Sequence, residues 1–123
     1  MDGKIETFRQ LEAWKQGHAL VLIIYKHTAS FPKEEVFGLT SQIRRAVVSI
    51  TSNIAEGFSR NSWKEKLQFY AISMGSLTEV ENQLFIARDI GYISGDICNQ
   101  SMELAEHVGR LLTGLIKKCK SMS

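Results

Sequence analysis

The chain of 123 residues contains a single proline, Pro32. Proline is the residue that most often interrupts helices, so its near absence predicts long continuous helices. Hydrophobic runs are also short. The longest, Leu20 to Tyr25, is far shorter than the roughly 20 apolar residues that a membrane-spanning helix needs. The polar start, Met1-Asp2-Gly3-Lys4, does not read as a secretory signal. We therefore expect a cytoplasmic protein that does not enter membranes.

Cysteine is scarce as well, with Cys98 and Cys119 only. Both fall on one expected helix, 21 residues apart. At about 1.5 Å of rise per residue they would lie about 30 Å apart, too far for a disulfide within one subunit. We expect two reduced thiols, as is usual inside cells.

The motifs of several enzyme classes are missing. No Glu-x-x-His sequence supports a di-iron site, and Glu103 with His107 has no matching pair elsewhere. Neither a nucleophile elbow nor a glycine-rich phosphate loop is present. We expect no enzymatic activity, no cofactor, no metal and no small-molecule substrate.

The composition is that of a soluble globular protein, with 44% hydrophobic and 23% charged residues. A chain of this length forms one domain and buries roughly two-thirds of its unfolded surface. The net charge of +2 permits an anionic partner without demanding one.

Hydrophobic spacing and end signals predict four helices. Phe31-Pro32 ends the first, Ser62 and Glu65 form a capping box before the third, and Gly91 stops it. Short connections favour a single-domain, all-α, antiparallel up-and-down four-helix bundle. The expected helices cover residues 11–30, 39–59, 63–90 and 95–120.

The helix over residues 63–90 carries apolar side chains on two sides. One side holds Leu67, Tyr70, Met74, Leu77 and Leu84; the other holds Phe69, Ile72, Val80 and Ala87. The helix over residues 11–30 also carries apolar side chains on more than one side. Each helix of a monomeric bundle needs only one apolar stripe. A wide core stripe with a few exposed residues is one explanation. We favour the other, a subunit interface in a homo-oligomer.

A row of short polar side chains follows the helix over residues 39–59. Such residues are mediocre helix formers, so something other than water is expected to face them. They either form a buried hydrogen-bond network that sets helix register or subunit pairing, or line a pocket or nucleic-acid contact. The row consists of Gln42, Arg45, Ser49, Asn53 and Glu56, facing Ser76 and Glu79 on the next helix.

Basic residues gather around the aromatic Trp63, whose ring is suited to stacking on a base. In an antiparallel bundle the last helix ends at this same pole. These charges either keep the helix ends soluble or bind nucleic acid. In an oligomer the same charges would recur in every subunit, which would strengthen the electrostatic field around them. The set comprises Arg44, Arg60, Lys64 and Lys66 near Trp63, with Lys117, Lys118 and Lys120 from the last helix.

Over nearly its whole length the chain resembles the four-helix bundle proteins known as 23S rRNA-intervening sequence proteins. The resemblance implies a ring-shaped homopentamer, and the family name records where some of its genes lie rather than an activity. A related branch serves as accessory subunits of reverse transcriptases in diversity-generating retroelements and binds the polymerase and nucleic acid through basic surfaces. The motifs and residues that carry the resemblance are Phe31-Pro32, Glu35, Gly38-Leu39, Ser41 to Ala46, Ser49-Ile50, Ser52 to Gly57, Gly75 to Leu77, Glu79, Glu81 and Gly91 to Ile93.

We therefore expect a non-enzymatic homo-oligomer that binds RNA, DNA or a nucleic-acid enzyme such as a reverse transcriptase through its basic pole. The alternative is a purely structural protein–protein assembly module. Steeply salt-dependent nucleic-acid binding separates the two hypotheses.

Overall fold

A computed structural model describes residues 4–123. It contains four α-helices, α1 (Glu12–Thr28), α2 (Leu39–Ser59), α3 (Trp63–Asp89) and α4 (Gly95–Met122), and two short 3-10 helices, η1 (Phe8–Gln10) and η2 (Lys33–Glu35). No strand occurs in the described residues. The predicted all-α fold with four helices is confirmed.

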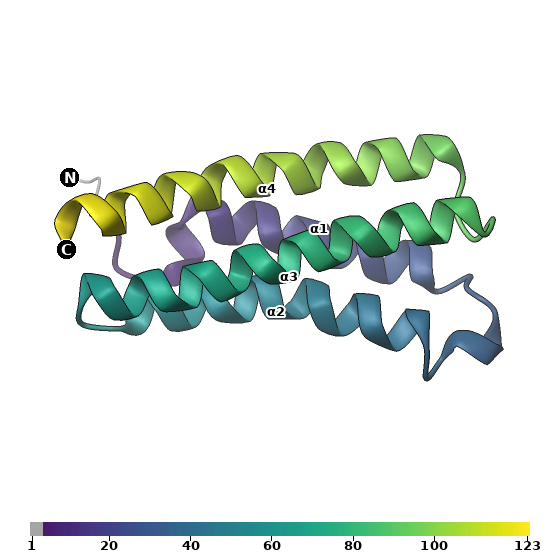
Figure 1. Ribbon diagram of the computed structural model, residues 1–123, viewed down its shortest axis with the longest axis horizontal. Helices are drawn as coiled ribbons and strands as arrows, with labels where there is room; N and C mark the ends of the chain where they lie inside the picture. Colours follow the sequence, from purple (N-terminus) through teal and green to yellow (C-terminus); the bar gives the residue numbers. More distant parts are fainter. Residues whose placement is uncertain (1–3) are drawn as a thin grey trace.

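Each long helix contacts two of the others. The backbones of α1 and α3 each run close to those of α2 and α4, but within residues 4–123 the backbones of α1 and α3 do not come close to each other. The two therefore lie diagonally across the bundle. Figure 1 shows the start of the described chain, the C-terminus and the α2–α3 turn at one end, with η2 and the α3–α4 turn at the other. We call these the termini end and the η2 end.

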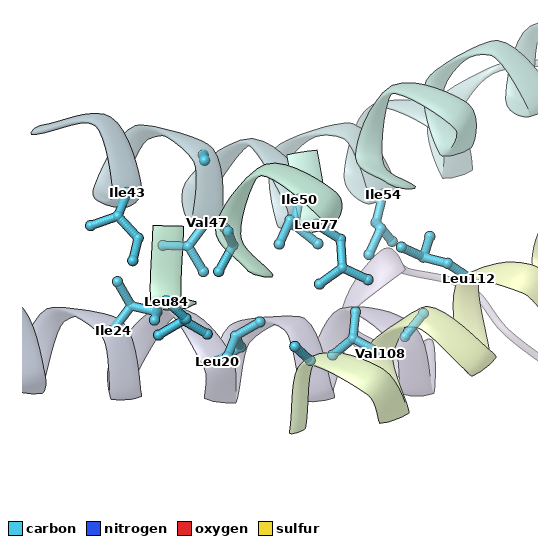
Figure 2. Packing of buried hydrophobic residues seen from close by; sticks show 14 of the residues in the cluster. Leu20, Ile24, Ile43, Val47, Ile50, Ile54, Leu77, Leu84, Val108 and Leu112 are labelled. Carbon is cyan, nitrogen blue, oxygen red and sulfur yellow. The ribbon is translucent and has the colours of Figure 1, made fainter. Parts of the chain in front are cut away.

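Apolar side chains from all four helices fill the centre of the bundle (Figure 2). Leu20 of α1, Ile50 of α2, Val80 of α3 and Leu112 of α4 are each 0% exposed. Complete burial of one such side chain contributes roughly 1.5–3 kcal/mol. The core therefore runs along most of the bundle, which makes the ends and outer faces the places to look for function.

The ends of α3 follow the signals in the sequence. The Ser62 hydroxyl accepts a hydrogen bond from the Glu65 amide at 3.1 Å, as expected of a cap. The Glu65 carboxylate, however, binds the Ser62 hydroxyl at 3.2 Å and not the Ser62 amide. After α3, Gly91 adopts φ +87°, a left-handed conformation that favours glycine and ends the helix.

At the η2 end, one carboxylate joins two loops. Glu35 accepts hydrogen bonds from the Leu39 amide at 3.0 Å and from the Tyr92 hydroxyl at 2.8 Å. The hydrogen bond from the Leu39 amide is the main cause that lowers the pKa of Glu35, and the bond from the Tyr92 hydroxyl is the second. The bond between Tyr92 and Glu35 also raises the pKa of Tyr92. The Phe31 and Tyr92 rings pack alongside, 5.1 Å apart.

Large apolar side chains remain exposed on two sides of the bundle. The expected second apolar side of α3 needs correction, because Val80 and Ala87 are 0% exposed. Since α3 packs against both α2 and α4, its buried arc is wide enough to include them. We call the first exposed set the α1–α2 surface (Leu22, Tyr25, Val36, Phe37 and Val48) and the second the α3 surface (Ile72, Ile86 and Ile90).

Candidate nucleic-acid interface

Trp63, the first residue of α3, lies close to lysines of two helices at the termini end. The Lys66 ammonium lies 5.9 Å from the centre of the Trp63 ring, and that of Lys118, from α4, lies 5.7 Å away. Both distances allow cation–π attraction. The structure therefore brings the start of α3 and the end of α4 together, as the sequence predicted for this pole.

Lys66 is also tied to the end of α2. Its ammonium donates hydrogen bonds to the carbonyl of Phe58 at 2.7 Å and to that of Gly57 at 3.3 Å. These carbonyls belong to the last turn of α2, where the helix dipole is negative and few amide partners remain; that of Gly57 also accepts from the Arg60 amide at 3.2 Å. Lys66 therefore stabilises the α2–α3 turn, and part of its charge is already neutralised there.

Arg60 is similarly engaged. Its guanidinium forms an ion pair with Glu56 at 2.9 Å and lies 4.6 Å from the centre of the Phe69 ring. The Nε atom of Arg60 is buried and has no hydrogen-bond partner within the described structure. The side chain thus holds the end of α2 against α3, and its charge is locally balanced.

Four other lysines at this end are exposed. Lys64 lies on the first turn of α3, next to Trp63. Lys117, Lys118 and Lys120 lie on the last turns of α4, so their charges approach those of α3 from a second helix. Long side chains of this kind carry mobile charges that neutralise phosphates without fixed geometry.

Arg44 does not belong to this cluster. Sixteen residues separate it from Arg60 on α2, about 24 Å along a helix. Its guanidinium donates to the Thr28 hydroxyl at 2.8 Å and to the Tyr25 carbonyl at 3.3 Å, and lies 4.5 Å from the Tyr25 ring centre. The expected grouping is corrected, because α2 carries Arg44 to the last turn of α1 near the η2 end.

A cavity of about 150 Å³ lies beside Trp63, and aromatic side chains that the sequence analysis did not assign to the site form part of its wall. Phe58 and Tyr70 line it together with Lys66, Lys118 and Cys119. Burial raises the pKa of Tyr70 to about 12 and also raises the pKa of Cys119. Neither group ionises at neutral pH, so the cavity offers apolar contact rather than a nucleophile.

The polar row on α2 links this helix to α3 at two points. The Ser49 and Ser76 hydroxyls share a hydrogen bond of 2.8 Å, and the buried Ser73 hydroxyl donates to the Ile50 carbonyl at 2.8 Å. The Asn53 amide donates to the Ser49 carbonyl at 2.8 Å and hydroxyl at 3.0 Å. These bonds set the register between the two helices.

The remaining members of the row stay outside this network. Gln42 and Arg45 are exposed, and Glu56 binds Arg60 on its own helix. Glu79 accepts a hydrogen bond from the Gln83 amide at 3.4 Å. Arg45 makes no ion pair within residues 4–123.

A second hollow, of about 590 Å³, runs between α3 and α4. Glu81 and Glu106 line it, with Arg110 and Lys117 nearby. Burial is the main cause that raises the pKa of Glu81, and the nearby Glu106 carboxylate is the second. Across residues 4–123 no three His, Cys, Asp or Glu side chains gather in a way that would hold a metal ion. None of the helices in that range is sufficiently long and apolar to span a bilayer.

Comparisons with known proteins give one family match and one similar fold. The family model described as 23S rRNA-intervening sequence protein matches residues 9–114. A solved structure from Bacteroides thetaiotaomicron VPI-5482, a protein with unknown function from the S23 ribosomal protein family, is similar with a TM-score of 0.77. The two chains are 21% identical, and the match covers 85% of this chain and 98% of the other. That likeness shows the fold alone. A search of curated proteins found no match.

Proposed function

Because the chain belongs to the 23S rRNA-intervening sequence protein family, we propose that it is a non-enzymatic protein that binds nucleic acid through the termini end. In this proposal the cytoplasmic chain folds as an up-and-down antiparallel bundle and assembles as a ring of identical subunits, with five as the count that the family resemblance suggests. The single observation that supports the binding role most is the position of Trp63 close to both Lys66 and Lys118.

The chemistry of this end suits a polyanion with accessible bases. Exposed lysines gain affinity by releasing counterions from phosphates, and an aromatic ring contributes about 1–3 kcal/mol for each stacked base. A ring of five copies would carry a net charge of about +10, which concentrates a polyanion near the lysines. Small individual contacts would therefore add up across the assembly.

The same residues predict binding with little sequence preference. Lysine acts as a point charge, whereas reading of base edges relies on bidentate groups such as arginine, asparagine or glutamine. The Arg60 guanidinium already binds Glu56. We expect contacts to phosphates and stacking on Trp63 rather than direct base readout.

Binding of labelled single-stranded RNA and DNA, followed by fluorescence anisotropy at several salt concentrations, tests the proposal. The double variant Lys118→Ala/Lys120→Ala should bind more weakly and show a shallower dependence on salt. The matched control, Lys26→Ala/Lys33→Ala, removes two exposed lysines away from the termini end and should bind nearly as the parent does. Equal weakening in both variants, or no binding at low salt, would reject the assigned interface.

A second candidate is a protein–protein assembly module without nucleic-acid binding. The exposed apolar residues of the α1–α2 and α3 surfaces favour it, and Phe37, 95% exposed, is the clearest example. A polymerase such as a reverse transcriptase is one partner to test by co-purification. Stable self-assembly together with no binding of RNA or DNA would support this second role.

A further inference from the structure

The cavity beside Trp63 has largely apolar walls. Its volume is about 150 Å³. Tyr70, 3% exposed, and Cys119, 0% exposed, lie on its inner side, and Phe58 and Leu115 add apolar wall. An apolar cavity of about this size stays dry and can hold a ring as small as benzene. The space therefore suits one hydrocarbon ring better than water.

The rim of the same cavity is basic. Lys118 is exposed and Lys66 half-buried, and both line the cavity. No carboxylate is found among the lining residues in the described part of the chain. Burial raises the pKa of Cys119, and the positive charges of Lys66 and Lys118 act in the opposite direction. Both charges are therefore felt at the inner wall, where they favour an anion.

The two lysines have donors left for such an anion. A lysine ammonium has three N–H donors. Two of those on Lys66 bind the carbonyls of Phe58 and Gly57, which fixes the ammonium in place and leaves a third. Lys118 makes no ion pair within residues 4–123. One charge is thus held at a set position, and the other can move to meet a ligand.

We propose that this cavity binds a small carboxylic acid with a single hydrocarbon ring, of about the size of benzoate. The ring packs against Phe58, Tyr70 and Leu115, and the ammonium groups of Lys66 and Lys118 hold the carboxylate at the rim. This site goes beyond the proposed function, because it needs no nucleic acid. Its ligand would occupy charges that otherwise face phosphates, so the acid should compete with nucleic acid at the termini end.

A hydrocarbon ring fits these walls better than a nucleobase does. A base carries carbonyl and amino groups along its edges, and these lose water when the base enters a cavity. The side chains of Phe58, Leu11 and Leu115 offer no hydrogen-bonding atom, so part of the base edge would be left without partners. An amine of the same size would meet two positive charges instead of a counterion.

Titration of ¹⁵N-labelled protein with sodium benzoate, followed by nuclear magnetic resonance, tests the site. The chain has two tryptophans and therefore two indole N–H signals, which the variant Trp14→Phe assigns. Trp63 lines the cavity and Trp14 does not, so the Trp63 signal should move more. A dissociation constant of about 1 mM or lower is expected for a ligand this small. No saturable movement of the Trp63 signal would overturn the proposal.

Related compounds separate the ring from the charge in the unaltered protein. Benzylamine, which reverses the charge, should bind about 10-fold more weakly or worse, and benzyl alcohol should fall between it and benzoate. Acetate at equal ionic strength should leave the Trp63 signal in place. Equal affinity for benzoate and benzylamine, or an equal response to acetate, would overturn the proposal. Tighter binding of uridine monophosphate than of benzoate would assign the cavity to a nucleotide and overturn the ligand class.

Variants then locate the site. Lys118→Met should weaken benzoate binding by about 3- to 5-fold, whereas the matched control Lys120→Met, which does not line the cavity, should change it by less than about 2-fold. Leu115→Phe should fill the space and weaken binding by about 10-fold or more. Unchanged affinity in both Lys118→Met and Leu115→Phe would overturn the proposal. Benzoate binding without RNA or DNA binding would reject the proposed function alone, and the converse would reject this inference alone.

Discussion

Replacement of Gly57 by alanine should destabilise the protein, although alanine is normally the better helix residue. Gly57 lies in the last turn of α2 and is buried. An added Cβ atom would lie 2.7 Å from Cε1 and 2.9 Å from Cδ1 of Tyr70. At Gly114 on α4, by contrast, an added Cβ atom meets nothing within 4 Å. The two glycines therefore form a matched pair.

The magnitudes follow from two opposing terms. Alanine gains about 0.5–1 kcal/mol over glycine inside a helix. Overpacking of a filled site costs about 1–3 kcal/mol. The Tyr70 ring is 3% exposed and has little space to move, and separation of α2 from α3 would stretch the bond of Lys66 to Phe58. We expect Gly57→Ala to lower the free energy of unfolding by about 1–2 kcal/mol and Gly114→Ala to raise it by about 0.5–1 kcal/mol.

Urea unfolding followed by far-ultraviolet circular dichroism measures both changes. The midpoints should move in opposite directions while the dependence on urea stays the same. Both variants must be compared at one protein concentration, because self-association would add to apparent stability. If Gly57→Ala stabilised the protein as much as Gly114→Ala does, the close packing of α2 against Tyr70 would be refuted.

Three further predictions concern the ends of the bundle and the hollow between α3 and α4. Lys66→Met should cost about 1–2 kcal/mol by leaving two carbonyls without their charged donor, whereas Lys64→Met, at an exposed position, should cost little in thermal unfolding. Tyr92→Phe removes the hydrogen bond to Glu35 and should lower the melting temperature at neutral pH. The pKa of Glu35 is lowered in the folded protein, so the stability that its carboxylate contributes is lost when the carboxylate becomes protonated. The difference between the variant and the parent should therefore shrink below about pH 4. Glu81→Gln should do the reverse: since the raised pKa of Glu81 makes its charged form unfavourable in the folded state, the substitution should stabilise the protein at about pH 7 and have little effect at about pH 3.

Local signals in the sequence were sufficient for the number of helices and for several of their ends. Pro32, Ser62 and Gly91 act through their own backbone geometry or through partners a few residues away. Such effects do not depend on the rest of the fold, so they can be recognised without it. The sequence motif from Ser52 to Gly57 also indicated the family, because this order of residues is specific.

The candidate interface was predicted in part. Trp63, Lys66 and Lys118 come together as expected for one pole of a bundle. The engagement of Lys66 with the end of α2, and of Arg60 with Glu56 and Phe69, was not foreseen. Charge counts alone do not reveal which cations already have partners.

What the sequence by itself determined is therefore local: where helices form, how several of them end, and which family the chain resembles. Only the tertiary structure decided how the helices are rotated and aligned against one another. That choice placed Arg44 on the end of α1, buried Val80 and Ala87, and left Phe37 exposed. The physical reason is that helix periodicity specifies a direction around one axis, whereas register between helices comes from packing and bonds such as Ser49 to Ser76, which join residues 27 apart.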